Sequence, residues 1–436
     1  MDQPRGLHLH ALPDELLHQI ISDLLGHAPA KSLKNGPGFL DFRLASRHLN
    51  RIALPIISQF YFHERTLPLR EDKIQSFAAN MTQHTFFRDS VRALTIDFPS
   101  VDTPNYPVQL DKDLLPVGNP EVSQFVAHMS SLLSHVLETL PSLDTITLRG
   151  NPQLKNILRH GREWRYLEDV ERALRVREVL GTYTTAIIHD IMLILSRTGI
   201  HLTRLCIVTP PLLRISALSR NANQGESRNP PFSLPRPVQI DELQLHGFRP
   251  PGTGGLWSVW DEREDGGASH IVQFTHIFSG IRAMSISFAR SDALPGITLL
   301  RQHVCERQFV RKLSTALRLP TLDTLKLTHN ICDERDLFAL LQAHATTLKD
   351  VHLIDIWLMD GSWKHFFLNV YDELPGITSL VAEDCIGPEG GMVCFRNLGP
   401  GGFTEWDGDG EKIGSFDFKF HVAGGHTRED IEGLQC

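Results

Sequence analysis

Cysteines are few and scattered in this 436-residue chain. They stand at positions 206, 305, 332, 385, 394 and 436, and no C-x-x-C pair occurs. This pattern lacks the close spacing of zinc sites, and it is typical of free thiols in a reducing compartment rather than of a disulfide framework. We therefore expect a cytoplasmic or nuclear protein without a metal centre built on cysteine.

Long hydrophobic runs are also missing. The best apolar run, IMLILS at 191–196, is far shorter than the stretch of about 20 apolar residues that crosses a membrane. The N-terminus lacks the basic region and uninterrupted apolar stretch of a secretory signal. Acidic residues outnumber basic ones, 51 against 43, whereas a nucleic-acid-binding surface needs a basic field. We therefore expect neither a membrane nor a nucleic acid as the main partner.

Catalytic motifs are absent as well. The sequence contains no G-x-S-x-G, H-E-x-x-H or G-x-x-x-x-G-K-[ST] motif. The segment GTGGLW at 252–257 lacks the third glycine of a dinucleotide-binding turn, and DGDGEKIG at 407–414 lacks the spacing of a calcium loop. No set of residues supplies a nucleophile, a base and an orienting group together. We expect a non-catalytic protein with no cofactor and no metal.

The clearest helical pattern lies near the N-terminus. LPDELLHQIISDLL at 12–25 places apolar residues at helical spacing, with Pro13 at the first helical position and acidic residues in the first turn. A second apolar face runs along residues 39–62, where Pro55 predicts two helices that break near Leu54. A unit this small buries little surface, so an exposed apolar face on it would need a partner or a neighbouring domain.

These two stretches resemble an F-box of fungal type, which reads L-P-x-E-L-L-x-x-I, then a loop, then L-R-x-x-S-R and a proline. The resemblance covers residues 10–62. The loop between the halves is longer than in that family, and Asp41 and Phe42 stand where the family has Asp-Leu. In that family the module docks on the Skp linker subunit of cullin-based ubiquitin ligases. The resemblance implies a partner-binding surface made of Leu12, Pro13, Glu15, Leu16, Leu17, Ile20, Leu24, Leu44 and Pro55.

A short pattern repeats along the rest of the chain. LPSLDTITLRGN at 140–151 and LPTLDTLKLTHN at 319–330 share Leu-Pro, Leu-Asp-Thr, a later Leu and the final Asn. Looser copies occur between and beside them, and each alternates apolar with other residues as a short, half-buried strand does. The equivalent anchor positions of these strands are Leu94, Ile146, Leu205, Leu243, Met284, Leu325, Val351 and Leu380.

Helical patterns separate the strands, at 122–140, 184–199, 307–320 and 333–348. This alternation resembles an irregular leucine-rich-repeat solenoid, in which short strands form one parallel sheet. The last two steps between anchors, 26 residues (325 to 351) and 29 residues (351 to 380), fit the usual repeat of about 20–29 residues, whereas the earlier steps need insertions. An ordinary α/β domain is the alternative, because all buried parallel strands look alike.

Two segments between strands are interpreted as insertions. Residues 219–237 are polar and rich in proline, and residues 249–270 are Gly-rich and carry Trp257 and Trp260 beside an acidic run. The two tryptophans are candidates for substrate recognition, or else they fold back onto the edge of the solenoid. The chain turns Gly-rich after residue 386, and the alternation of residues 412–422 predicts a closing strand.

We therefore predict an α/β protein with an F-box-like helical module at 1–65, a connecting segment at 66–90, a leucine-rich-repeat-like substrate-binding domain at 91–385 and a Gly-rich cap or tail at 386–436. The polar residues 63–73 suggest a short hinge. The resemblance implies a non-catalytic adaptor that holds an unknown target protein for an SCF-type cullin ligase. Two alternatives stay open: a repeat scaffold whose N-terminal helices only cap the solenoid, and an α/β enzyme with an unrecognised pocket at the strand ends.

Overall fold

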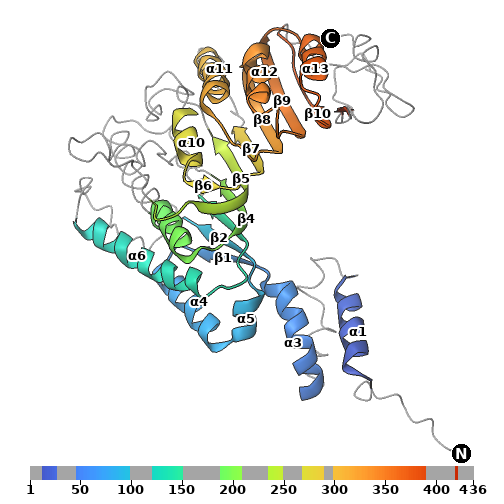
Figure 1. Cartoon of the computed structure of the whole chain (residues 1–436). Helices are drawn as coiled ribbons and strands as arrows, with labels where there is room; N and C mark the ends of the chain where they lie inside the picture. Colours follow the sequence, from blue (N-terminus) through green and yellow to red (C-terminus); the bar gives the residue numbers. More distant parts are fainter. Residues whose placement is uncertain are drawn as a thin grey trace, which may run out of the picture.

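An open β-sheet with helices along one of its faces makes up most of the computed structural model (Figure 1). The structure describes residues 12–26, 46–98, 120–150, 187–208, 234–248, 268–288, 298–388 and 418–420. Along the sheet the strands follow the order β1-β2-β3-β4-β5-β7-β8-β9-β10-β11, which is the order of the chain, and β6 pairs with β5. All pairs are parallel except β10 with β11, which is antiparallel.

Most strands are short, whereas β5, β8 and β9 are longer. Parallel neighbours cannot be joined by a tight hairpin, so a crossover segment must connect each strand to the next. In chain order the strands are β1 (Glu64–Pro68), β2 (Ala93–Asp97), β3 (Thr145–Arg149), β4 (Leu202–Val208), β5 (Val238–Phe248), β6 (Phe278–Ser279), β7 (Ala283–Phe288), β8 (Thr324–Asp333), β9 (Asp350–Asp360), β10 (Ser379–Glu383) and β11 (Phe418–Phe420).

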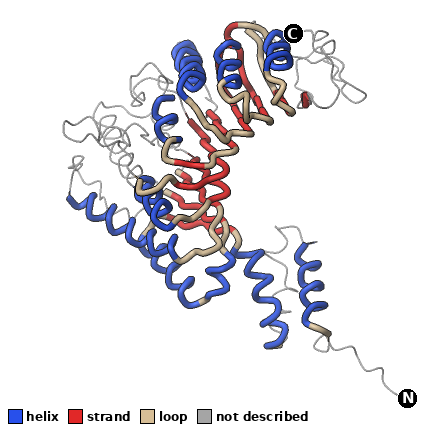
Figure 2. The backbone as a smooth tube through the Cα atoms, viewed as in Figure 1, coloured by secondary structure: helices blue, strands red, loops and turns tan. Residues whose placement is uncertain are grey.

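Helices occupy the crossovers and cover one face of the sheet. Figure 2 shows the strands as one curved band with the helices along its outer side. Residues 187–198 form one of these helices, directly before β4. The others are α4 (Glu71–Gln83), α5 (Thr85–Ser90), α6 (Pro120–Glu138), α10 (Ala268–Thr275), α11 (Thr298–Ala316), α12 (Glu334–Gln342) and α13 (Trp363–Glu373).

The predicted anchor residues form one continuous row across the sheet. Each anchor lies opposite the next in the strand register, from Leu94 in β2 to Leu380 in β10. All eight anchors are at most 1% exposed. A second buried row stands two positions later, as the two-residue period of a strand requires. Its members are Ile96, Leu148, Ile207, Leu245, Ile286, Leu327, Leu353 and Ala382.

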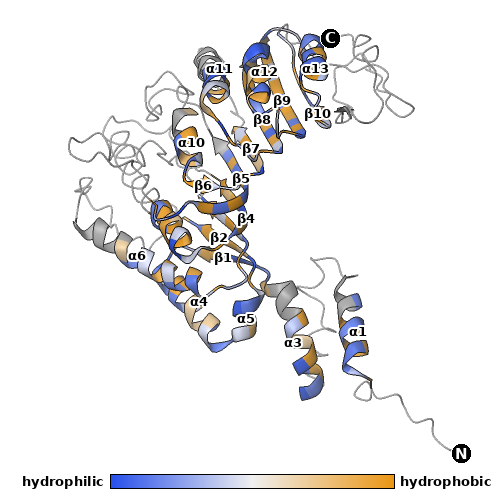
Figure 3. Cartoon of the chain, viewed as in Figure 1, coloured by the Kyte–Doolittle hydropathy of each residue, from blue (hydrophilic) through white to orange (hydrophobic). Residues whose placement is uncertain are grey.

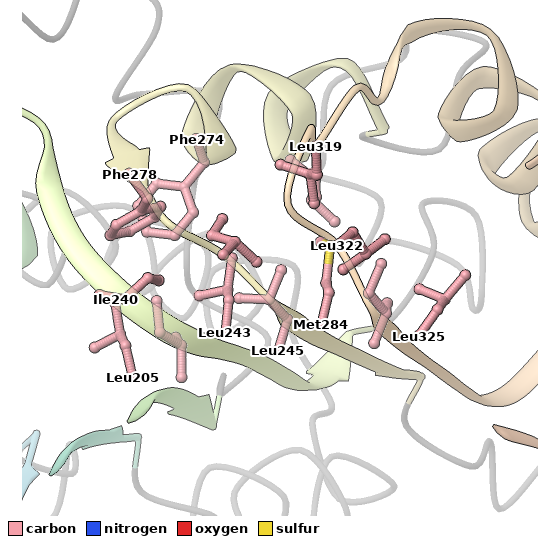
Figure 4. Close-up of a cluster of buried hydrophobic side chains, with 14 of the residues drawn as sticks. Leu205, Ile240, Leu243, Leu245, Phe274, Phe278, Met284, Leu319, Leu322 and Leu325 are labelled. Carbon is pink, nitrogen blue, oxygen red and sulfur yellow. The ribbon is translucent and has the colours of Figure 1, made fainter. Parts of the chain in front are cut away.

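The helices supply the other half of this core. Phe309 of α11 packs edge-on against Phe288 of β7, with ring centroids 4.8 Å apart. Figure 4 shows the middle of the core, where Phe274 and Phe278 lie over Ile240. Hydrophobic and hydrophilic residues alternate along the strands in Figure 3, and the buried hydrophobic rows lie on the helix-covered face of the sheet.

Polar contacts link the three helices nearest the C-terminal strands. The carboxylate of Asp333, at the end of β8, accepts hydrogen bonds from Arg307 (2.7 Å) and Arg311 (3.3 Å) of α11. Glu334, the first residue of α12, accepts a hydrogen bond from the backbone N–H of Ser362 at 2.7 Å and contacts His365 of α13. These contacts tie α11 to α12 and α12 to α13.

Two helices near the N-terminus, α1 (Asp14–Gly26) and α3 (Arg47–Phe62), form a separate unit that we call the helical pair (Figure 1). The hydroxyl of Ser46 caps α3 by accepting a hydrogen bond from the N–H of Leu49 at 3.1 Å. The carboxylate of Asp14 lies 3.2 Å from the His48 ring nitrogen and 3.6 Å from Arg51. The apolar core of the pair is Leu17, Ile21, Leu49, Ile52, Ala53 and Ile56, with Leu12 packed against it.

The predicted break of the second helix near Leu54 is wrong, because α3 runs through Pro55. Proline lacks the N–H that would bond one turn back. Its ring lies on the exposed side of the helix, however, while Ile52 and Ile56 are buried against α1. The burial of these neighbours maintains the helix across the missing hydrogen bond.

Residues 63–73 form a strand and the start of a helix rather than a hinge. His63 is the only residue between α3 and β1, and β1 pairs with β2 along its whole length. Leu67 and Leu69 are 2% and 3% exposed and belong to the core of the sheet. The range 66–90, assigned from the sequence to a connecting segment, thus contains part of β1 together with α4 and α5.

The other predicted elements are mostly confirmed, with changes at their ends. Helices occur at 120–138 and 187–198, α11 begins earlier than expected, and α12 ends earlier. The predicted closing strand is confirmed at β11, which covers the outer edge of β10. Trp257 and Trp260 lie outside the described residues, as do most of the two predicted insertions.

Candidate functional site

The surface of α1 carries an exposed apolar stripe. Leu16 is 47% exposed and is the one large hydrophobic residue with so open a side chain in the described part of the chain. Leu12 and Ile20 stand one helical turn before and after it and are partly exposed, and Pro13 is exposed. Residues four apart share a face of a helix. The stripe therefore begins at Leu12, which also packs against the core shared with α3, and continues through Leu16 and Ile20.

The predicted partner-binding residues divide into exposed and buried ones. Glu15 and Pro55 are exposed together with the stripe. The inclusion of Leu17 is a correction: its side chain is fully buried between α1 and α3, so a partner cannot reach it in this arrangement. Leu44 and the side chain of Leu24 lie outside the described residues.

The helical pair joins the sheet through an aromatic contact. The Phe62 ring at the end of α3 packs edge-on against Phe87 of α5, with centroids 3.9 Å apart. The Arg65 guanidinium lies 4.1 Å from the centroid of the Phe62 ring, a cation–π geometry. Burial lowers the pKa of Arg65. The helical pair is thus packed against α5 and the first strand of the sheet.

The sheet face opposite the helices, which we call the open face, is mainly polar, although Thr95, Cys206, Ser285 and Val381 are buried in it. Its central row crosses the strands in register, one position after each anchor. Small hydroxyl-bearing residues dominate the N-terminal end of this row. The row consists of Thr66, Thr95, Thr147, Cys206, Gln244, Ser285, Lys326, His352 and Val381.

Charges on this open face are paired between neighbouring strands. Arg149 of β3 donates to the Asp97 carboxylate of β2 at 2.7 and 2.9 Å, and this hydrogen bond raises the pKa of Arg149. Arg204 of β4 donates to Glu242 of β5 at 2.6 Å. Such exposed pairs contribute about 0.2–1 kcal/mol each and favour the observed strand register.

Two buried cysteines, Cys206 and Cys385, are poor nucleophiles. Burial raises the pKa of Cys206 to about 11 and that of Cys385 to about 12, so both are protonated near neutral pH. The thiolate is the nucleophilic form of cysteine. Neither thiol is therefore poised for nucleophilic chemistry.

The last three parallel strands bend at equivalent positions. His329, Asp355 and Asp384 have φ angles of 56°, 52° and 52°, and each stands four residues after its anchor. His329 hydrogen-bonds Asp355 across the strands at 2.7 Å. Periodicity alone did not reveal these bends. A signal is present in the sequence, since Asp and His tolerate positive φ better than most residues and recur there at one spacing.

No protein-family model and no curated protein matches the chain. Within the described ranges, no helix is long and apolar enough to cross a membrane. The same ranges contain no group of three or more His, Cys, Asp or Glu side chains that could hold a metal ion.

Proposed function

We propose that this protein is a non-catalytic substrate adaptor of an SCF-type cullin ubiquitin ligase. The helical pair acts as the F-box and docks on the Skp linker, and the sheet domain, an irregular leucine-rich-repeat solenoid, binds the target protein. Catalysis by such an adaptor is proximity alone, because it raises the effective concentration of the target beside the ligase. The exposed Leu16 carries the proposal.

The α1 stripe supports docking on a partner. Leu17 and Ile21 fill the contact with α3 and Leu12 packs beside them, so Leu16 and the partly exposed Ile20 remain for another surface. Leu16 is 47% exposed, so covering it contributes about half of the roughly 1.5–3 kcal/mol that full burial of a leucine side chain gives. These positions are the ones that match the F-box pattern in the sequence. A soluble partner that covers the stripe would gain this free energy.

The order and spacing of the strands support the repeat domain. Apart from the two-residue β6, each strand pairs with the strand before it in the chain, as in a solenoid whose repeats contact only their neighbours. A third buried apolar residue stands three positions before each anchor, which completes the L-x-x-L-x-L core of a leucine-rich repeat. These residues are Val91, Leu143, Leu202, Ile240, Ile281, Leu322, Leu348 and Ile377.

Co-expression of the full chain with a Skp linker subunit tests the proposal. The two proteins should co-elute in size-exclusion chromatography. Leu16→Glu should abolish co-elution, because it places a charge in the centre of the apolar contact. His18→Glu is the matched control, since it adds the same charge on an exposed side of α1 away from the stripe. Co-elution of Leu16→Glu, or no co-elution of a folded and monodisperse wild type, would contradict docking through α1.

One observation favours a second function, that of a repeat scaffold without a ligase. The contact between Phe62 and Phe87 packs the helical pair onto the end of the sheet, as a capping unit would be packed. Terminal caps are required by solenoids, whose end repeats otherwise expose their cores. The same chromatography separates the two functions, because a cap has no affinity for the linker.

A further inference from the structure

The open face changes character at its C-terminal end. From β1 to β7 the positions that point away from the helices are mostly small, polar or charged, as the central row and the ion pairs illustrate. In β8, β9 and the residues after β10, half-buried apolar side chains take such positions beside and beyond the bends. These side chains are Ile331, Ile354, Trp357, Met359 and Ile386, and we call them the apolar patch.

The patch is continuous because of the strand register. Ile331 of β8 pairs with Trp357 of β9, and Trp357 forms a bridge with Ile386 after β10. Ile354 lies three residues before Trp357 on β9, and Met359 lies two residues after it. Apolar groups thus stand side by side on three neighbouring strands. A contiguous apolar patch on an otherwise polar face is typical of a binding surface.

The bends turn Ile331 and Trp357 into the patch, whereas Ile354 faces outward by ordinary strand alternation. After Asp355, Ile356 turns into the core, where it is fully buried, and Trp357 turns outward. The same change after His329 buries Asn330 and turns Ile331 outward. A non-glycine residue at positive φ costs of order 1 kcal/mol, and such residues gather at binding and catalytic sites. All three strained residues of the described chain lie at the base of this patch.

Carboxylates outnumber basic side chains around the patch, although Asp355 is bonded to His329 and Asp360 lies in the field of Arg307. The carboxylates of Asp355 and Asp384 stand at the bends, and Glu383 and Asp360 lie at the ends of β10 and β9. Within β8, β9 and β10, Lys326 is the only lysine or arginine. Complementary charge steers association and selects partners. The patch is therefore complementary to a ligand that has an apolar group with positively charged groups next to it.

From these observations we infer that the apolar patch binds an extended segment of the target protein, with a bulky apolar side chain seated against Trp357 and basic residues beside the surrounding carboxylates. The inference rests on the proposed function, because it assigns the place where the adaptor holds its target. Trp357 is the central anchor, as aromatic residues commonly are in interfaces. Lysine or arginine flanks of the target segment pair with Glu383 and Asp384.

Degenerate peptide libraries test the inference on the full-length protein. One library fixes lysines on both sides of a central Trp, Phe or Leu, a second replaces the lysines with glutamates, and a third replaces the central residue with serine. Binding is measured by fluorescence anisotropy. The lysine library should bind at least about tenfold more tightly than either of the others, a difference of about 1.4 kcal/mol.

Two variants assign this binding to the patch. Trp357→Ala should weaken the lysine library at least about tenfold, whereas Thr147→Ala, on the open face of β3, should change its affinity less than about twofold. Glu383→Lys should weaken the lysine library and strengthen the glutamate library. Glu64→Lys, the same change in β1 at the far end of the sheet, is its control. Thermal melting checks that each variant is folded. If Trp357→Ala does not fold, the result for Glu383→Lys alone tests whether the patch binds the peptides.

The outcomes separate this inference from the proposed function. Equal binding of the lysine and glutamate libraries, or no binding of any library, would overturn the patch as a target site even if the linker co-elutes. Binding lost in Trp357→Ala and Glu383→Lys would support the patch even if the linker does not co-elute. Leu16→Glu should leave peptide affinity unchanged, because the two surfaces lie on different parts of the chain.

Discussion

The helical pair and the sheet are both stabilised by apolar side chains, but the two cores differ in size and in closure. The pair buries six residues with Leu12 beside them, and it leaves Leu16 open to water. The sheet buries complete rows between strands and helices, from Leu67 in β1 to Leu380 in β10. A closed core needs no partner, whereas a small unit gains stability from one.

This difference also separates the kinds of surface that each part offers. On the helical pair the free surface is a stripe on one helix, set by the spacing of Leu12, Leu16 and Ile20. On the sheet it is a broad face set by strand register, where polar residues occupy most positions. The predictions that follow test whether the two cores behave as separate units.

The largest expected effect is on the core of the sheet. Leu325→Ala should lower the free energy of unfolding by about 2–5 kcal/mol, because Leu325 is fully buried in the anchor row and its truncation leaves a cavity. Urea denaturation followed by circular dichroism measures the change. A loss below about 1 kcal/mol would contradict the close packing of this row.

Gly361→Ala should have the next largest effect. Gly361 has φ of +94°, which costs an alanine about 1–2 kcal/mol, and its added Cβ would collide with the side chain of Glu334. The collision also disturbs the hydrogen bond from Ser362 to Glu334.

Gly199→Ala is the matched control for this change. Its φ is +68°, but an added Cβ meets nothing within 4 Å, so only the backbone cost remains. Equal losses in the two variants, measured by thermal unfolding, would contradict the proposed role of Glu334 as the link between α12 and α13.

The sheet core should also lose stability in mild acid through His344. This side chain is 3% exposed; its Nδ1–H donates to the Leu340 carbonyl at 3.0 Å and its Nε2 accepts from the Leu319 N–H at 3.3 Å. Burial lowers its pKa below the ordinary value of 6.5. The unfolded chain therefore binds the proton more readily than the folded chain. Stability is complete above pH 6.5 and falls as the pH drops from there toward the folded pKa.

Urea midpoints measured between about pH 7.5 and pH 5.5 check this dependence. His344→Gln should have a smaller acid loss than the wild type, because glutamine does not titrate. His246, whose pKa burial also lowers, contributes equally to both proteins and cancels in the comparison. The same acid loss in variant and wild type would show that other groups cause it.

The smallest effect on the sheet should come from Leu17→Ala. The substitution removes a fully buried side chain of the helical pair and should speed amide hydrogen exchange in α1 and α3. The urea midpoint of the sheet should stay unchanged, because Leu17 belongs to the other core. A parallel loss in both parts would mean that the contact of Phe62 with Phe87 joins them into one cooperative unit.

The strands of the sheet were predictable because alternation is a local property. The anchors from Leu94 to Leu380 lie in register because the same spacing of apolar residues recurs in each strand. Strand β1 was not predicted from the sequence. Its segment ERTLP has the charged Arg65 at the anchor position, and only Leu67 is buried. Its guanidinium is accommodated by the Phe62 ring, a contact between elements that no local pattern predicts.

The candidate surfaces were predictable in part. Periodicity marked Leu16 and Leu17 alike as apolar, and only the packing of α3 decides that Leu17 is buried and Leu16 exposed. The bends at His329, Asp355 and Asp384 depend on single φ angles, so the outward turn of Trp357 could not be read from alternation. Pro55 led to the wrong prediction of a helix break, because the burial of Ile52 and Ile56 outweighs the local preference of proline to end a helix.

The single residue between α3 and β1 has a mechanical consequence. Only His63 separates α3 from β1, and the Phe62 ring packs against Phe87. A partner bound to the stripe of α1 would therefore have a defined orientation relative to the sheet. The curvature of the sheet, rather than a flexible linker, then sets the distance and direction from the stripe of α1 to a molecule bound near β10.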